Sequence, residues 1–357
     1  MTGKHPLRWT DPARIKRHHP SEAMEVHFRR LIQLTVASEE KILVAVSGGM
    51  DSVALLHLLV ACLERPRDRI VAAHFDHGLR RESIEEAVFV VQRCQHLEIP
   101  WVQERWSTPH GPGNLQERAR EARYRFFSAA AVEHGCRWVA TGHHGDDQGE
   151  TFLEHLLRGS GLKGLSAIPF IRPLQPGIDL LRPMLFFFRE EIHQWMRSQG
   201  LEWREDPSNH SDRYVRSRLR HEVVPVLATL APQVRRQLLA TSMRMARAEE
   251  ALSWTLDHFW STLEVETFGS GLSLARSALV ALPDELIVRV LARCSKELRG
   301  GSSHPLGSRA LDGFLHMVHS PVRHWRMEVR GLEISRDDTK IFLCIAMKAP
   351  RRKTNKK

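Results

Sequence analysis

The chain has 357 residues, of which 42% are hydrophobic and 26% are charged, and its formal net charge at pH 7 is +10. This length favours two or three domains, and the hydrophobic fraction is high enough for packed cores, which argues against wholesale disorder. No stretch approaches roughly 18 consecutive apolar residues, and the polar, basic start lacks the apolar region of a secretory signal. Five widely separated cysteines without a CxxC pair indicate neither a zinc site nor a redox pair. We therefore expect a cytoplasmic protein in a reducing compartment, with no membrane partner.

The positive charge is concentrated at the two ends of the chain. Residues 1–20 and 347–357 together hold the whole surplus, so the segment between them is net neutral. A basic chain can bind a polyanion such as nucleic acid, but basic tails can also serve only as solubilising segments. Charge alone leaves both interpretations open.

Strand and helix patterns alternate over the first part of the chain. Short apolar runs predict strands at residues 42–46, 69–75, 101–106 and 137–141. Apolar spacing typical of helices predicts helices at residues 51–64, 84–97, 115–134 and 147–158. This alternation predicts an α/β domain whose parallel sheet is covered by helices on both faces.

The pattern changes after residue 158. A glycine-rich stretch at residues 159–164 predicts a mobile basic loop, or else a plain linker, and a proline-spaced segment follows it. Further helices are predicted at residues 189–199, from about 214 to Pro225, and at 234–263 and 279–297, with a strand pair at 325–329 and 340–345. The C-terminal part is therefore expected to be a mainly helical domain with a small β end.

A glycine-rich turn joins the first strand to the first helix. Its residues are Ser47, Gly48, Gly49, Met50, Asp51 and Ser52. The glycines allow close approach of a ligand, and the following helix presents free N–H groups to an anion. Asp51 beside phosphates would be repulsive unless Mg²⁺ lay between them. The alternative is an ordinary turn capped by Asp51 or Ser52.

A second polar segment follows the fourth strand. It runs from His143 to Glu150, at the carboxyl edge of the sheet, where open α/β sheets bind ligands. Asp147 and Glu150 are three residues apart at a helix start, so they share a face and could hold Mg²⁺ or accept a proton. The alternative is a capping arrangement with a solvated acidic turn. Zinc is disfavoured, because phosphate chemistry prefers oxygen-bound Mg²⁺.

Arginines gather in two further segments. Residues 213–221 hold four arginines and no acid, which suits a phosphate or an RNA backbone, although an exposed helix would look the same. The helix at 115–134 carries four more, several of which are expected to pair with Glu117 and Glu121. Only one or two of these should reach a ligand.

The turn at residues 47–52 resembles the PP-loop of the N-type ATP pyrophosphatases, which have an adenine nucleotide α-hydrolase-like fold. Within that superfamily, further segments across residues 41–225 resemble the tRNA(Ile)-lysidine synthases. These segments are residues 74–80, 113–120, 141–151, 157–162, 205–209 and 218–222. Phe75 occupies the hydrophobic position before Asp76, which is a small departure from the residue typical of the family. The C-terminal part of the chain resembles the family only loosely.

The resemblance implies an activity. Such enzymes use ATP to join free L-lysine to C2 of the wobble cytidine, position 34, of tRNA(Ile) with a CAU anticodon. The cytidine is first adenylated with release of pyrophosphate, and the lysine amine then displaces AMP. ATP, Mg²⁺, this tRNA and lysine are thus the expected cofactors and partners, and a homodimer is left open.

The resemblance also implies site residues. ATP would be bound by the turn at residues 47–52, and Mg²⁺ by Asp51 and Asp147. The catalytic residues carried over by motif position are Asp51, His143, Asp147, Glu150, Arg123 and Arg218. The expected domains are a basic extension at 1–38, the catalytic PP-loop domain at 39–228, a tRNA-binding domain at 229–346 and a basic tail at 347–357.

Two other functions stay open from the sequence. A PP-loop tRNA thiolase would commonly need paired cysteines or an iron–sulfur cluster, and this chain has no suitable pair. A catalytically inactive tRNA-binding protein on the same fold would bind tRNA without releasing pyrophosphate. The intact turn at 47–52 and the carboxylates Asp147 and Glu150 argue against it.

Overall fold

The computed structural model describes residues 23–78, 83–107, 114–204, 215–301 and 306–346. The chain divides into two compact units, Met1–Glu249 and Glu250–Lys357, which are described separately. The basic tails and the segment at 205–209, together with Arg213, lie outside the described residues. The domain limits expected from the sequence, with the roles attached to them, stay a prediction.

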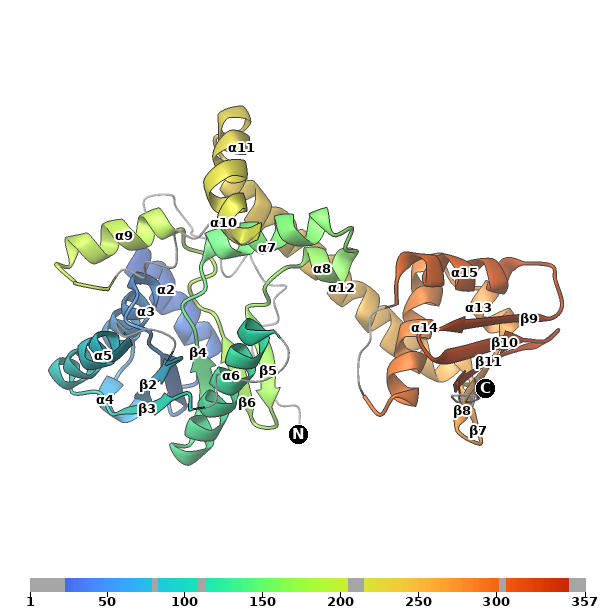
Figure 1. Cartoon of the computed structure of the whole chain (residues 1–357), viewed down its shortest axis with the longest axis horizontal. Coiled ribbons are helices and arrows are strands. Elements are labelled where there is room, and N and C mark those ends of the chain that lie inside the picture. The colour runs from blue at the N-terminus through green and yellow to red at the C-terminus, as the bar shows by residue number, and fades with distance from the viewer. Residues whose placement is uncertain (1–22, 79–82, 108–113, 205–214, 302–305, 347–357) are drawn as a thin grey trace, which may run out of the picture. The chain divides into compact units, whose positions relative to one another are not determined.

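The first unit is built on a six-stranded sheet with the order β3-β2-β1-β4-β6-β5 (Figure 1). Its strands are β1 (Lys41–Ala45), β2 (Ile70–Asp76), β3 (Trp101–Arg105), β4 (Cys136–Ala140), β5 (Ile171–Gln175) and β6 (Ile178–Leu181). All neighbouring pairs are parallel except β5 with β6. The predicted mostly parallel sheet is confirmed. The hairpin of β5 and β6 was not predicted, because Pro173 interrupts β5 and a parallel pattern does not signal an edge hairpin.

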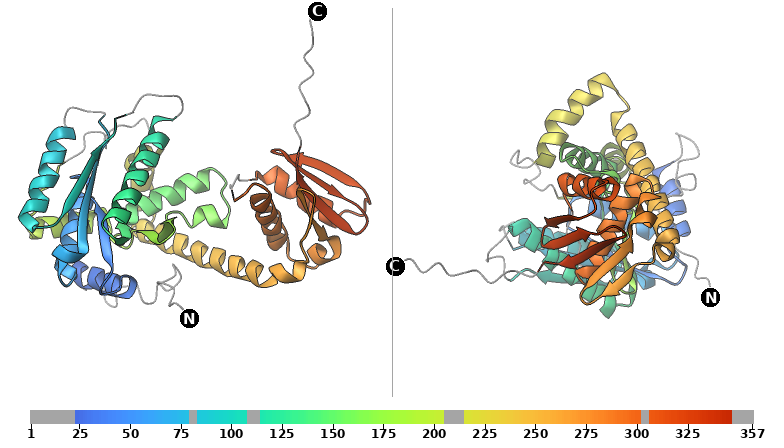
Figure 2. Two further views of the ribbon diagram at one scale, coloured as in Figure 1. Left: turned by 90° about the horizontal axis from the view of Figure 1, so that it is seen from below. Right: turned by 90° about the vertical axis from the view of Figure 1, so that its right-hand side faces the viewer.

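Helices cover both faces of this sheet (Figures 1 and 2). Alternate residues of β1 show the two faces, because Ile42 and Val44 belong to one hydrophobic core and Leu43 to the other. The helices on the Ile42 side are α2 (Met24–Thr35), α3 (Met50–Cys62), α5 (Ser83–Leu97) and α9 (Arg189–Ser198), and the short α4 (Pro66–Arg69) lies between α3 and β2 in the chain. The Leu43 side is covered by α6 (Leu115–Glu133).

Helix α2 lies within the segment that the sequence assigned to a basic extension. Its Phe28, Leu31 and Ile32 are almost completely buried and pack in the same core as α3. Residues 24–35 therefore contribute to the fold of the first unit. At roughly 25 cal/mol per Å² of buried apolar surface, three such side chains make a stabilising contribution of several kcal/mol, about 2 for each.

After β4 the chain forms α7 (Gly145–Leu157) and α8 (Leu162–Leu165). The stretch predicted as a mobile basic loop contains α8, and the His155 ring is 2.6 Å from the Gly164 carbonyl oxygen. Buried Gln148 ties α7 to its surroundings, since its amide donates to the Ser166 carbonyl and to the Ser242 hydroxyl. The start of α7 is thus held firmly against neighbouring elements.

The helix predicted to stop at Pro225 continues beyond it, so that limit was wrong. The chain forms α10 (Val215–Arg218), the π-helix η2 (Leu219–Val223) and α11 (Val224–Leu230) in direct succession. Pro225 lies in the first turn of α11, where an N–H need not have a helical partner. Next come α12 (Val234–Phe259) and the short η3 (Trp260–Leu263).

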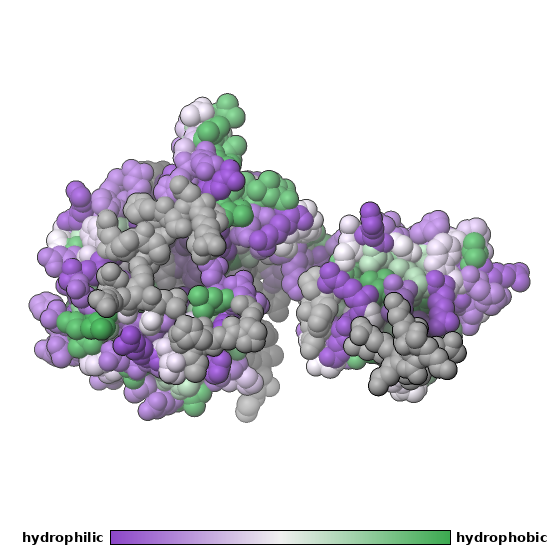
Figure 3. All heavy atoms as spheres, viewed as in Figure 1, coloured by the Kyte–Doolittle hydropathy of each residue, from purple (hydrophilic) through white to green (hydrophobic). Residues whose placement is uncertain are grey.

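Apolar side chains are exposed on α11, which is mostly green in Figure 3. Val226 is 60% exposed and Leu230 is 81% exposed. Nothing in the structure says what covers them, so the homodimer stays a prediction. No helix within the described ranges is long and apolar enough to cross a membrane.

The second unit combines helices with a five-stranded antiparallel sheet of order β7-β8-β11-β10-β9. Its elements are β7 (Glu266–Phe268), β8 (Gly271–Ala275), α13 (Arg276–Val280), α14 (Asp284–Leu298), α15 (Ser308–His319), β9 (Trp325–Val329), β10 (Leu332–Arg336) and β11 (Lys340–Ile345). The predicted strands at 325–329 and 340–345 exist but do not pair with each other, because β10 lies between them. The helix predicted at 279–297 is two helices, since Pro283 ends the first and precedes the second.

Candidate active site

A cavity of about 1170 Å³ lies at the carboxyl edge of the sheet in the first unit. It is lined by the loop after β1 and by the loop after β4, two strands that are neighbours in the sheet. From β1 the strand order runs to β2 and β3, and on the other side of β4 it runs to β6. The cavity therefore occupies the point where the strand order reverses, the usual ligand site of an open α/β sheet.

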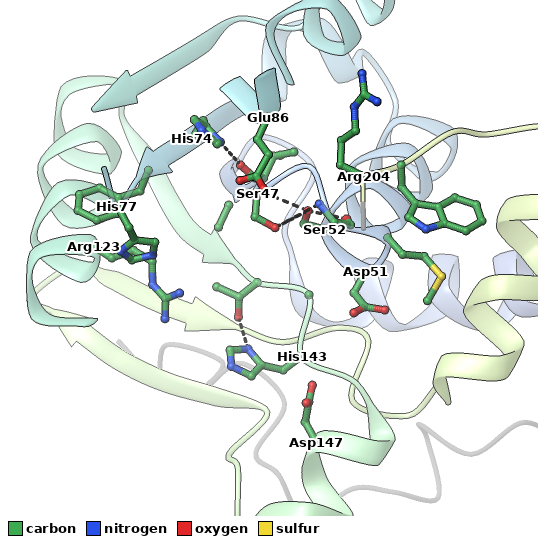
Figure 4. Close-up of a pocket in the computed structure, with 18 of the residues that line it drawn as sticks. Ser47, Asp51, Ser52, His74, His77, Glu86, Arg123, His143, Asp147 and Arg204 are labelled. Atoms are coloured by element: carbon green, nitrogen blue, oxygen red, sulfur yellow. Dashed lines mark hydrogen bonds between the residues drawn. The ribbon is translucent and has the colours of Figure 1, made fainter. Parts of the chain in front are cut away.

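The turn at residues 47–52 is folded by its own hydroxyl groups. Gly48 has a φ of +92°, a conformation that suits glycine alone. The Ser52 hydroxyl accepts from the Ser47 backbone N–H at 3.1 Å and donates to the Gly49 carbonyl at 2.9 Å (Figure 4). The N-terminus of α3 has no side-chain cap, so the alternative of an ordinary turn capped by Asp51 or Ser52 is excluded. The first N–H groups of α3 are available to an anion.

The loop after β4 approaches this turn closely. A Cβ atom on Gly142 would lie 3.0 Å from the backbone carbon and oxygen of Asp51, which is tighter than most real Cβ contacts. Glycine at this position is what allows the two loops to share one cavity. The close approach also fixes where α7 begins relative to α3.

The start of α7 is a capping box built on His144. Its Nδ1 accepts from the Asp146 backbone N–H at 3.2 Å, and the Asp147 carboxylate accepts from the His144 backbone N–H at 3.0 Å. The capping alternative for this segment is therefore correct in part. Asp147 nonetheless lines the cavity, so it caps the helix with one oxygen while facing a ligand.

His144 is the residue that the sequence did not single out. Because its Nδ1 accepts a hydrogen bond, a neutral ring carries its proton on Nε2. That Nε2 lies 3.7 Å from Asp51 and 3.6 Å from Asp147, between the two loops. The ring is only 2% exposed. Histidine is not a preferred N-cap, so no sequence signal marked this role.

The two cavity carboxylates are held in different electrostatic states. Burial raises the pKa of Asp51, an effect that the nearby Asp147 reinforces and that His144 opposes. Burial would also raise the pKa of Asp147, but the two histidines, the His144 backbone N–H and Arg220 outweigh it and lower that pKa. Asp51 Oδ1 is buried without a hydrogen-bond partner. This oxygen is therefore open to a cation.

His143 lies beside these carboxylates and points into the cavity (Figure 4). Its Nδ1 is 2.9 Å from the Thr141 hydroxyl. Burial lowers the pKa of His143 to about 4, and Arg182, Arg123 and Arg120 contribute while Asp147 opposes them. The ring is neutral near pH 7.

Glu150 forms an ion pair with Arg220. Its two oxygens accept from Arg220 at 2.6 and 3.1 Å, and Glu150 is 3% exposed. Burial raises the pKa of Glu150 although Arg220 opposes this shift. The same Arg220 also reaches Asp147 at 3.5 Å. Glu150 thus positions Arg220 and is not itself open to a ligand.

Of the arginines carried over from the family, Arg123 lines the cavity and Arg218 does not. Arg218 is exposed and pairs with Glu222 at 3.0 Å, so its catalytic role stays a prediction. The neighbouring Arg220 takes the inward position and pairs with Glu150, because side chains two residues apart on a helical turn point to opposite sides. The cavity is also lined by Arg189, Arg204, Arg216 and Arg235.

Known proteins resemble this chain in sequence. The PP-loop domain family matches residues 20–227. A tRNA(Ile)-lysidine synthase of Ruegeria pomeroyi is 38% identical over 76% of this chain and 64% of its own length. One from Geobacillus kaustophilus is 39% identical over 73% of this chain and 57% of its own. The chain thus spans less than two thirds of the length of these relatives.

A solved structure resembles the fold. A U34-tRNA thiolase from Methanococcus maripaludis superposes with a TM-score of 0.52 at 16% identity, covering 62% of this chain and 78% of its own. At this identity the likeness concerns the fold alone. The sequence match over residues 20–227 and the loop geometry agree, and the chain belongs to the PP-loop domain family.

Proposed function

We propose that the protein ligates free L-lysine to C2 of the wobble cytidine, position 34, of tRNA(Ile) with a CAU anticodon. The observation that supports this most is the meeting of two loops in one cavity. One loop offers uncapped N–H groups, and the other offers the Asp147 carboxylate and the neutral His143 ring. The relatives named tRNA(Ile)-lysidine synthase supply the substrate class. The cytoplasm, where tRNA is modified, is the compartment that suits this activity.

The site fits ATP with Mg²⁺. Asp51 and Asp147 would hold the ion together with the nucleotide phosphates, which is how Mg²⁺ is commonly bound. No cluster of three or more metal-binding side chains occurs among the described residues, so the phosphates must complete the coordination. Asp51 Oδ1, buried and without a partner, supports this assignment. The bound ion would offset the charge that develops on the phosphates.

In the first step the cytidine C2 oxygen attacks the α-phosphate of ATP, and pyrophosphate leaves. The start of α3 and the Ser47 hydroxyl hold the phosphates. Arg123 and Arg220 lie on the cavity wall, where their charges stabilise the developing anion. The product is a cytidine adenylated at its C2 oxygen.

In the second step the lysine amine attacks C2, and AMP leaves. The amine must lose a proton before it attacks. A nearby group therefore has to bind the amine, and a base has to accept the proton. Asp147 is better placed than Glu150 to bind this amine, because Asp147 lines the cavity and Glu150 is paired with Arg220. Residues 229–346 are proposed to bind the tRNA.

The test supplies the purified protein with an unmodified tRNA(Ile) transcript bearing a CAU anticodon, ATP, Mg²⁺ and labelled lysine. The label should enter the RNA, with one pyrophosphate released for each lysine. No incorporation, while RNA still binds, would favour an inactive tRNA-binding protein. A transcript that gains sulfur in place of lysine would favour a thiolase, although all five cysteines are unpaired.

A further inference from the structure

Four arginines surround one tyrosine next to the cavity. The guanidinium carbons of Arg120, Arg172 and Arg123 lie 5.2, 5.3 and 5.5 Å from the centre of the Tyr124 ring. Arg182 approaches the same phenol, and together these charges lower the pKa of Tyr124 although burial would raise it. The cluster joins α6 to β5 and to the end of β6, on the side of the sheet that α6 covers.

No acid in the described residues offsets this charge by an ion pair with any of the four. Arg182 is only 3% exposed, and its Nη1 donates to the Pro169 carbonyl at 2.6 Å. The Nε atoms of Arg172 and Arg182 are buried and have no hydrogen-bond partner. Four cations without a counter-ion repel one another, and burying them is costly unless an anion is bound.

The cluster opens toward the catalytic cavity and toward solvent. Arg123 lines the cavity beside His143, on the side away from Asp51 (Figure 4). Arg120 is exposed and Arg172 is half-buried, so a ligand can reach them from outside. Planar guanidinium groups with free donors are suited to phosphate oxygens.

We infer that this arginine cluster, Arg120, Arg123, Arg172 and Arg182, binds a phosphodiester of the RNA next to the nucleotide being modified. The inference rests on the proposed function, because a base that is modified must leave its stack and enter the cavity. The phosphates on either side of that base then lie at the rim of the cavity, next to the cluster. The phosphates of ATP are assigned to the turn at residues 47–52 and to Arg123, the member of the cluster that lines the cavity, so Arg120, Arg172 and Arg182 stay available to the RNA.

The test uses an anticodon stem–loop RNA without ATP or lysine, so that binding alone is measured. Replacing both Arg120 and Arg172 by Gln should weaken binding about tenfold, since charge-assisted hydrogen bonds are lost. The slope of log affinity against log salt should fall by about 1 to 2 for two lost contacts. Arg125→Gln, an exposed arginine of the same helix, is the matched control and should change neither quantity. The Arg172→Lys variant should recover part of the affinity.

A neutral methylphosphonate on either side of the wobble nucleotide identifies the contact. On that RNA the double variant and the wild type should bind equally, because the partner of the arginines is gone. Equal losses on charged and neutral RNA would overturn the inference, as would unchanged RNA affinity in a variant whose thermal unfolding matches the wild type. Weakened ATP binding with intact RNA binding would also overturn it, by assigning the cluster to ATP. Failure of the proposed function is seen separately, as wild-type protein that binds RNA but incorporates no lysine.

Discussion

The loop after β1 and the loop after β4 enter the same cavity, but they offer a ligand opposite kinds of group. The first presents hydroxyls and the uncapped N–H groups of α3, which attract an anion. The second presents Asp147 and the His143 ring, and the side chains of the capping box take up N–H groups at the start of α7. Two helix starts side by side thus have different functions, because one is capped by side chains and the other is not.

Asp51 is an exception to this difference between the two loops, because its carboxylate lies within the anion-binding loop. Burial raises its pKa, so its ionised form is unfavourable in the absence of a cation. A cation shared by Asp51, Asp147 and the phosphates would join the two loops into one site. The following changes test that comparison, from the largest expected effect to the smallest.

Asp51→Asn should reduce lysine incorporation about a thousandfold, because the site loses the charge that holds the cation. The raised pKa means that ionised Asp51 opposes folding near neutral pH, so the variant should unfold at the same temperature or higher. Exposed Asp68→Asn is the control and should keep full activity. Full activity in Asp51→Asn would remove the proposed magnesium site.

Glu150→Gln should lower the free energy of unfolding by about 2 kcal/mol, because Arg220 loses its charged bidentate partner, while the burial that raises the pKa of Glu150 offsets part of this loss. Asp147→Asn should cost only about 1 kcal/mol, because it weakens one cap and one long contact. Chemical unfolding of the protein measures the loss in free energy of unfolding for both variants. Equal losses would show that Glu150 contributes no more to the free energy of unfolding than Asp147 does.

Gly142→Ala should separate the two loops, since its Cβ would lie 3.0 Å from the Asp51 backbone. We expect a loss of about 1 to 3 kcal/mol in stability, with about tenfold lower lysine incorporation. Gly307→Ala serves as the control, because no atom lies within 4 Å of its added Cβ. Unchanged activity at Gly142 would mean that the loops tolerate a wider spacing.

Arg218→Gln should have the smallest effect, about fivefold on tRNA-dependent lysine incorporation. Its guanidinium is exposed and forms an ion pair with Glu222, so ATP affinity should not change. Separate titrations with ATP and with tRNA measure the two effects. A loss of ATP affinity would show that Arg218 enters the cavity in solution.

Apart from the short α4, the strands and helices over residues 42–158 were predicted to within about two residues. Strands β1, β2 and β4 are largely buried and followed by glycine or polar turns, so their pattern is unambiguous. The order of the motifs along this sheet also predicted that residues 47–52 and 143–150 would meet. Parallel strands bring their carboxyl ends to one edge, which requires no knowledge of tertiary packing.

The details that the sequence missed depend on tertiary structure. Arg218 and Arg220 lie on opposite sides of one helical turn, and the packing of that turn against α7 decides that Arg220 faces the cavity. His144 caps α7 although histidine is not a preferred N-cap residue, so its role was not signalled. The arginine cluster at Tyr124 joins α6 to the unpredicted β5 and β6 hairpin, so its members could not be grouped beforehand.

The most direct test of the two-loop site follows the α-phosphate of ATP. Protein, Mg²⁺, the CAU transcript and ATP labelled at the α-phosphate are mixed without lysine, and label on the RNA is measured. We predict that wild-type protein transfers the label to the RNA, that added lysine releases it as AMP, and that Asp51→Asn transfers none. Pyrophosphate release without labelled RNA, or equal labelling by Asp51→Asn, would contradict the account.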